Sequence, residues 1–239
     1  MINITSKIKY ICFFIAQIIK ILQLFFINLQ IDRSIDMQID PKAASQRDIY
    51  KILTGTVIPR PIGWISTVSE GGIPNLAPFS FFNAVGEDPP HVMFSTVHTG
   101  NAHKDTLNNV LATGEFVVNM ATEALAEAMN ATSVNLPPEG NEFEYAGLTP
   151  LPSVLVKPFR VKESPVHFEC RMVHQYTLEG HKDGGATIII GRIVMFHIDD
   201  SVLTEDFKIN PEMYRPIARL AGNNYATVGE IFSIKRPFI

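Results

Sequence analysis

The chain has 239 residues, of which 46% are hydrophobic and 18% charged, so it can bury a substantial core and is too apolar to be disordered throughout. Its formal net charge is −4 and it has no block of lysine and arginine, which argues against a nucleic-acid partner. Its two cysteines are far apart in the sequence. We therefore expect neither a disulfide scaffold nor a cysteine-rich zinc site, and we do expect a reducing, cytoplasmic location.

The first 36 residues carry a run rich in isoleucine and phenylalanine that resembles nothing later in the chain. No small-residue cleavage site follows it, which argues against a signal peptide. A lysine in its middle makes it a poor membrane span. When the residues are placed at helical steps of about 100°, the apolar side chains share one face, and the opposite face holds Lys9, Gln17, Lys20 and Gln23.

That pattern is typical of an amphipathic helix at a bilayer surface or in a partner's groove. The alternative is that the segment is incidental, because Met37 is a plausible second start. We therefore predict an extension over residues 1–36, able to contact a membrane surface through residues 8–31, and a single domain over residues 37–239.

From residue 37 onward, short runs with β character alternate with turn signals such as Gly71–Gly72. The runs predict strands at residues 61–69, 91–97, 115–121, 166–178 and 186–198. Gly191 is placed for a bulge or bend in the last of these. Helices are expected at residues 104–116, between Asp105 and a stop at Gly114, and at residues 122–132, capped by Thr122. Many strands with few helices favour a barrel over a doubly wound sheet.

Several common chemistries have no motif in this chain. There is no G-x-G-x-x-G, P-loop, C-x-x-C, H-E-x-x-H or G-x-S-x-G. The seven histidines do not fall at metal-ligand spacings, so no metal is expected.

The stretch from residue 60 to 90 predicts a hairpin with unusual contents. Arg60 is held extended by Pro61 and is either an ordinary surface charge or a ligand contact. Ser66 and Thr67 form a hydroxyl pair whose simplest interpretation is a solvent-facing alternation. Pro78 lacks an N–H, so neighbouring backbone groups at residues 77, 79 and 80 are candidates for another partner.

A second candidate region is Lys104-Asp105-Thr106, at the start of a predicted helix. The free N–H groups and the dipole of a helix start favour an anion. Together, the two regions offer hydroxyls, cations and a helix terminus for a phosphate, and an irregular strand for a flat heterocycle.

Five blocks occur in order between about residues 45 and 235: RPIGWIST, NLAPFSFFN, DPP, KDT with TGEFVVN, and PIARLAGNNYATV. They resemble the flavin reductase-like, FMN-binding split-barrel family, which includes the flavoredoxins. The resemblance implies a mainly β (α+β) fold, an FMN-binding split β-barrel with Greek-key-like connections and a few short helices. It also implies a homodimer with FMN near the subunit interface. Ala221 departs from the Arg-Leu-Gly-Gly run expected there.

The resemblance also implies roles for individual residues. Ser66 and Thr67 would bond the FMN phosphate or ribityl chain, and Lys104 and Thr106 would hold the phosphate, with Asp105 ordering the turn. The ring edge would meet backbone groups of Asn75, Ala77, Pro78, Phe79 and Ser80. Further contacts would come from Arg60 and Asn83.

These implications lead to a hypothesis about function. The chain would be an NAD(P)H-dependent flavin reductase that accepts a hydride at flavin N5 from NADH or NADPH and passes the electrons on. Such chemistry belongs to the cofactor and needs no protein acid or base, so no catalytic residue is predicted. The alternative is a flavoredoxin-type electron-transfer protein reduced by a protein partner. A membrane-associated form of either remains a third option.

Overall fold

The computed structural model describes residues 15, 17–20, 37–98, 104–137, 139–178 and 185–237. The chain divides into two compact units, Met1–Ser45 and Gln46–Ile239. In the first unit residues 15 and 17–20 are helical, and the rest of the predicted helix over residues 8–31 lies outside the described residues. No helix in the described part of the chain is long and apolar enough to cross a membrane. The predicted domain start at residue 37 stays a prediction.

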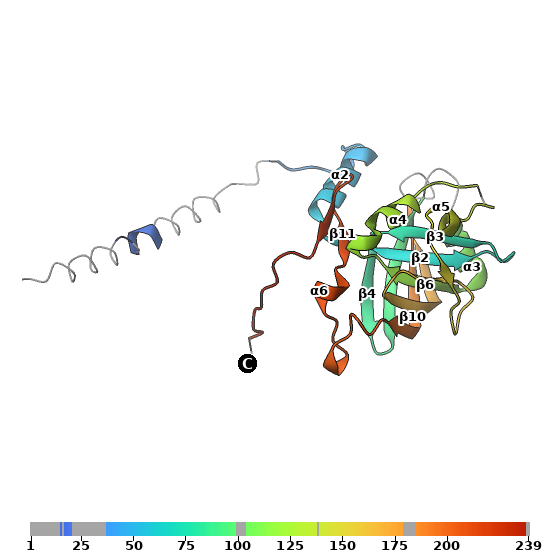
Figure 1. The fold of residues 1–239 in the computed structure, drawn as a ribbon. Coiled ribbons are helices and arrows are strands. Elements are labelled where there is room, and N and C mark those ends of the chain that lie inside the picture. The colour runs from blue at the N-terminus through green and yellow to red at the C-terminus, as the bar shows by residue number, and fades with distance from the viewer. Residues whose placement is uncertain are drawn as a thin grey trace, which may run out of the picture. The chain divides into compact units, whose positions relative to one another are not determined.

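The second unit is built mainly of strands, with short helices between them (Figure 1). Its elements in chain order are α2 (Gln46–Thr56), β1 (Arg60–Pro61), β2 (Gly63–Val68), β3 (Pro74–Phe79), β4 (Phe82–Glu87), β5 (Pro90–Val97), α3 (Asp105–Thr113), β6 (Glu115–Met120), η1 (Glu123–Leu125), α4 (Ala126–Ala131), α5 (Glu142–Tyr145), β7 (Pro150–Leu151), β8 (Arg160–Val161), β9 (Val166–Thr177), β10 (Ala186–Ile198), η2 (Glu205–Phe207), α6 (Pro211–Tyr214), β11 (Ile217–Arg219) and β12 (Tyr225–Thr227).

Seven strands form one antiparallel sheet in the order β3-β2-β6-β9-β10-β5-β4. Each of the five predicted strands corresponds to one of them, namely β2, β5, β6, β9 and β10. The predicted irregularity at Gly191 is confirmed, because the β9–β10 register shifts between Ile190 and Gly191. Two smaller sheets, β1-β11-β12 and β7-β8, complete the described strands.

The large sheet curls around one of the two core clusters that the described residues form. Phe79 on β3 and Phe94 on β5 come from opposite ends of the strand order, yet their ring centroids lie 5.2 Å apart. Phe116 on β6 packs edge-on against Phe94 at the same distance, and α3 adds Leu107 and Val110 to this cluster. Figure 1 shows β2 and β3 running steeply across β4, as in a closed or nearly closed barrel. The mainly β fold with few helices is therefore confirmed.

The helices agree with the sequence in part. α3 ends at Gly114, whose φ of 71° is the left-handed conformation that glycine adopts without strain. The predicted helix over residues 122–132 is divided into η1 and α4, and Thr122 makes no side-chain cap bond. α2 was not predicted, and it carries Tyr50 toward the candidate site described below.

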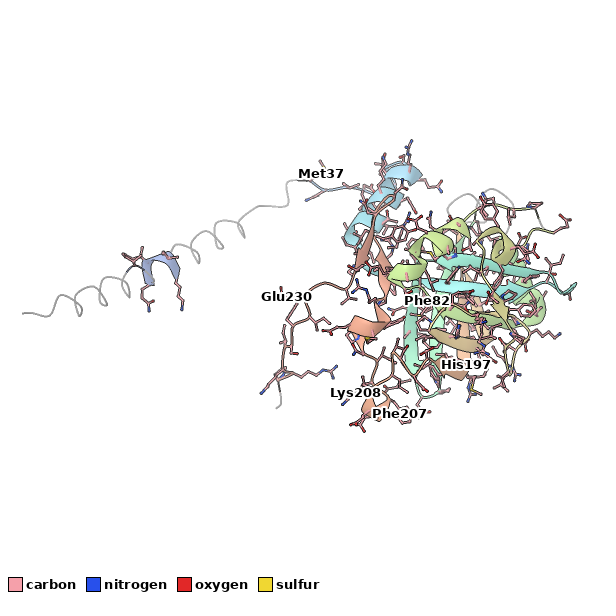
Figure 2. The ribbon with its side chains drawn as sticks, in the orientation of Figure 1. Met37, Phe82, His197, Phe207, Lys208 and Glu230 are labelled. Atoms are coloured by element: carbon pink, nitrogen blue, oxygen red, sulfur yellow. The ribbon has the colours of Figure 1, made fainter. Side chains whose placement is uncertain are left out.

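The segment after β10 extends away from the barrel. Figure 2 shows Phe82 and His197 within the strands and Phe207 and Lys208 at the tip of this segment. The chain then returns through α6 to β11, whose Arg219 pairs in register with Arg60 of β1. This return brings the last strands beside the start of the domain.

Candidate functional site

Three adjoining pockets meet at Pro78 on β3, with volumes of about 120, 300 and 200 Å³. The first, the phosphate pocket, lies between β3, the start of α3 and residues 132–136. The second, the ring pocket, is lined by Phe79, Phe81 and Val97 and shares Lys104 with the first. The third, the Arg219 pocket, reaches β11 and β12. Together they reach the size of ordinary ligand pockets, about 300–1,000 Å³.

β3 is an edge strand of the large sheet, which explains why it tolerates Pro78. The Leu76 N–H donates to Glu142 Oε2 at 3.1 Å, away from β2. Alternate residues of an antiparallel strand direct their backbone groups to the same side, so Pro78 also faces outward. Ala77 and Phe79 direct theirs to β2. The edge group that a ligand would meet is therefore the Pro78 carbonyl, rather than the backbone of Ala77 or Phe79.

The start of α3 is fixed against β3 by a buried bond. The Asn75 side-chain amide donates to the Thr106 hydroxyl at 2.9 Å, and both residues are buried. Lys104 immediately precedes the helix as its N-cap residue, and its ammonium lies 5.9 Å from the centroid of the Phe79 ring. Asp105 opens the helix and lines the same pocket. The structure thus brings together all three residues of the KDT block and Asn75.

Glu142 on α5 is the buried acid of the phosphate pocket. Burial raises the pKa of its carboxyl above the ordinary value, the N–H of Leu76 opposes that rise, and the nearby Asp105 adds to it. The pocket is lined by one cation, Lys104, and by two carboxyl groups, those of Asp105 and Glu142. The neutral form of Glu142 would remove one negative charge that would otherwise repel a phosphate.

Arg60 is a structural residue rather than a surface charge. It is only 5% exposed, and its guanidinium donates to the carbonyls of Thr54, Val57 and Leu220. A longer contact of 3.4 Å reaches the Ser80 hydroxyl. These bonds tie α2 to the segment after β11, so the predicted ligand contact from Arg60 has little donor capacity left to it.

Ser66 and Thr67 are both fully buried, so they are not a solvent-facing pair, and their predicted contact with FMN stays a prediction. The Ser66 hydroxyl donates to the Phe159 carbonyl at 2.5 Å, and the Thr67 hydroxyl accepts from Asn109 at 3.1 Å. The structure does not bring either hydroxyl to the three pockets. Their observed role is to fix β2 to the loop before β8 and to α3.

The three adjoining pockets together form one groove around Pro78. Of the remaining predicted residues, some line this groove and one lies on the surface. Pro78 and Ser80 line both the ring pocket and the Arg219 pocket, and Phe79 lines the ring pocket. Asn83 is exposed on β4, where its side chain accepts from the N–H of Ala84. It lies outside the three pockets.

Comparison with known proteins shows the family to which this chain belongs. Residues 54–218 match the model of the flavin reductase like domain. The chain belongs to the flavin reductase-like family. An uncharacterized protein of Aquifex aeolicus is 47% identical over 181 residues, covering 74% of this chain and 88% of that one.

Two solved structures extend the comparison. Nitrilotriacetate monooxygenase component B from Bacillus cereus is 38% identical, with a TM-score of 0.81, and covers 84% of this chain and 100% of its own. A Shewanella frigidimarina protein described as a flavin reductase with a split barrel domain superposes with a TM-score of 0.73 at 22% identity, over 84% and 100% of the two chains. The latter shows the fold, a split barrel.

The residues of this flavin reductase-like chain fit a flavin mononucleotide. A phosphate needs a cation and N–H donors, which Lys104 and the first turn of α3 supply. A flat ring needs an apolar wall with a few polar groups, and Phe79, Phe81 and the Pro78 carbonyl meet that need. Within the described residues no cluster of three metal-ligating side chains occurs.

Sequence reasoning missed three contributors to the groove: Glu142, Arg219 and residues 132–136. The signal for Glu142 was weak, since a lone glutamate in a loop-like stretch is usually solvated. Arg219 lies in the PIARLAGNNYATV block, which carried less weight because Ala221 departs from the expected Arg-Leu-Gly-Gly run.

Proposed function

We propose that this chain is an FMN-dependent oxidoreductase that takes a hydride from NADH or NADPH and passes the electrons on, with the groove around Pro78 as its site. The observation that carries the proposal is the position of Lys104. It lies at the start of α3 and lines both the phosphate pocket and the ring pocket. One cation at that junction serves a ligand that has a phosphate at one end and a flat ring at the other.

Lys104 and the N–H groups of residues 105 and 106 would hold the phosphate, and Phe79, Phe81 and the Pro78 carbonyl would meet the ring. FMN, when bound, supplies the hydride-accepting and electron-storing chemistry. The protein's own contribution is position. The buried Asn75–Thr106 bond holds the start of α3 in a constant place relative to β3, and the Phe79–Phe94 contact fixes the wall of the ring pocket.

No acid–base machinery is required of the chain. Hydride transfer between a nicotinamide and a flavin needs close stacking and an open ring face, and the ring pocket is open to solvent beside Tyr50, which is 57% exposed. The Glu142 carboxyl lines the phosphate pocket and not the ring pocket. Its effect is on the charge of the cofactor site.

A second candidate is an electron-transfer protein that keeps its FMN and receives electrons from a protein partner. The Bacillus cereus neighbour is named as one component of a monooxygenase, which favours a chain that works with a second protein. In both candidates the same groove binds the same cofactor, and they differ in the donor.

Steady-state oxidation of NADH and NADPH, with and without added free FMN, separates the two. A reductase turns over many equivalents of nucleotide per protein chain when flavin is supplied. No more than one equivalent oxidised per bound flavin, with either nucleotide, would reject the reductase and leave the electron-transfer protein.

A further inference from the structure

The groove has a second cationic end that the proposed flavin contacts do not use. This Arg219 pocket, about 200 Å³ in volume, meets the ring pocket at Pro78 and Ser80. Its far wall is formed by Arg219 on β11 and Tyr225 on β12, and Tyr50 lines the side that it shares with the ring pocket.

Arg219 is held in place rather than free in solvent. It lies opposite Tyr225 in the β11–β12 register, with its guanidinium carbon 4.5 Å from the centroid of the tyrosine ring. One of its N–H groups donates to the Gly222 carbonyl. The Tyr225 hydroxyl in turn donates to Asn130 at 3.0 Å. Because the guanidinium lies against the tyrosine ring and its N–H groups are already oriented, it loses little conformational entropy when it binds a planar or tetrahedral oxyanion.

The charge around Arg219 is uncompensated. Arg60 stands directly opposite it in the β1–β11 register, and like charges opposite one another destabilise a strand pair. Burial lowers the pKa of the Arg60 guanidinium, the interaction with Tyr50 opposes that shift, and the neighbouring Arg219 lowers the pKa further. Within the described residues neither guanidinium forms an ion pair with a carboxylate. The Arg219 pocket itself is lined by no acidic side chain.

A bound anion would relieve this repulsion, and the pocket's other contents indicate which kind. Two tyrosine rings and two serine hydroxyls, from Ser80 and Ser133, suit an aromatic ligand that carries phosphate. FMN has one phosphate, for which Lys104 is already in place at the other end of the groove. A dinucleotide donor brings further phosphates.

We propose that the Arg219 pocket binds a phosphate group of the nicotinamide dinucleotide that reduces the flavin, and so places its other end beside the ring pocket. This assignment rests on the proposed function. Arg219 is then a residue that determines donor affinity, and it has no role in holding FMN.

The test uses the protein loaded with FMN and titrates it calorimetrically with NAD⁺ and NADP⁺, comparing wild type with Arg219→Gln and Arg219→Lys. A lost charge-assisted bond to phosphate should weaken binding of the preferred nucleotide by about ten- to a hundredfold in Arg219→Gln. The Lys variant, which keeps the charge and loses the fork, should fall between. Arg192→Gln, an exposed arginine on β10 outside the groove, is the matched control and should change nothing.

Anaerobic reduction of the bound flavin by NADH or NADPH gives the second measurement. Arg219→Gln should raise the nucleotide concentration needed for half-maximal rate by the same factor and leave the limiting rate unchanged. If wild type is reduced and Arg219→Gln behaves identically in both measurements, the inference is wrong while the proposed function stands. If wild type is reduced by neither nucleotide, the proposed function fails.

FMN and riboflavin titrations of the same variants distinguish the remaining source of phosphate. Both flavins should bind Arg219→Gln as they bind wild type. A loss confined to FMN would show that Arg219 holds the cofactor's own phosphate, and would overturn the assignment to the donor.

Discussion

Among single residues, we expect Lys104 to matter most for FMN binding. Its ammonium lines the phosphate pocket at the start of α3, so we expect Lys104→Ala to weaken FMN binding by about ten- to a hundredfold, the equivalent of one charge-assisted hydrogen bond of about 1.5–3 kcal/mol. Riboflavin lacks the phosphate, so its binding should hardly change. Quenching of flavin fluorescence on titration of the apo-protein measures both. Equal losses for the two flavins would move Lys104 from the phosphate to the ring or to the fold.

The stability of the folded chain should depend on pH through Glu142. The pKa of its carboxyl is raised in the folded chain above the ordinary value of 4.5, chiefly by burial. The folded chain therefore holds more protons than the unfolded chain, and this group's contribution to stability falls as pH rises through the folded-state pKa. Glu142→Gln keeps an oxygen to accept from Leu76 and cannot ionise. It should raise the unfolding midpoint at neutral pH.

The advantage of Glu142→Gln should shrink as the pH falls toward 4.5, because the wild-type carboxyl is then protonated in the folded state and increasingly protonated in the unfolded state. Thermal unfolding across a series of buffers from pH 4 to pH 8 measures the difference. Glu144→Gln, an exposed glutamate on the same helix, is the matched control. A Glu142→Gln variant that is less stable than wild type at neutral pH would show that the ionised carboxylate stabilises the fold.

At the element scale, the β9–β10 pair depends on a glycine. A Cβ on Gly191 would lie 2.5 Å from Cε1 of Phe116, a fully buried ring, and 3.3 Å from Cβ of Cys170. Gly191→Ala should therefore lower the free energy of unfolding by about 1–3 kcal/mol, as overpacking does. Gly55→Ala, in α2 with nothing within 4 Å of the added carbon, should be neutral or stabilising. Urea unfolding of both variants measures the free energies of unfolding. An unchanged value for Gly191→Ala would show that the side chains around Phe116 move to accommodate the added carbon.

The elements also show what a sequence can predict. The long strands β9 and β10 were predictable because their runs of β-branched and aromatic residues carry a local signal. α3 was predictable because Gly114 is also a local signal, one that ends a helix. The KDT block and Pro78 were found because a helix start and a missing N–H are local properties.

The rest depended on distant partners. One of the carbonyls that hold Arg60 belongs to Leu220, 160 residues away, and Ser66 is held by Phe159. No pattern near residues 60 or 66 records those contacts, so their burial could not be predicted. Glu142 and Arg219 join the groove only because α5 and β11 fold back onto β3 and β1.

In the assembled fold, β9 and β10 leave several large apolar side chains exposed. Val173, Tyr176 and Phe196 are 51%, 58% and 48% exposed. Exposed apolar side chains of this size favour association, and we expect a symmetric homodimer with these strands near the interface. Light scattering at micromolar concentration should give twice the chain mass, and Val173→Asp should shift it toward the monomer. Leu111→Asp on α3, a comparably exposed position, is the control. A flavin-loaded wild-type monomer would refute the dimer.

The absorption spectrum of the purified protein shows whether the groove holds FMN that a nicotinamide nucleotide reduces. It is recorded without oxygen before and after addition of FMN and then of NADH or NADPH. We expect flavin bands that stay with the protein through gel filtration and bleach when one of the two nucleotides is added. A chain that retains no FMN, with the flavin eluting free and its spectrum unchanged, would contradict the assignment of an FMN site to this groove.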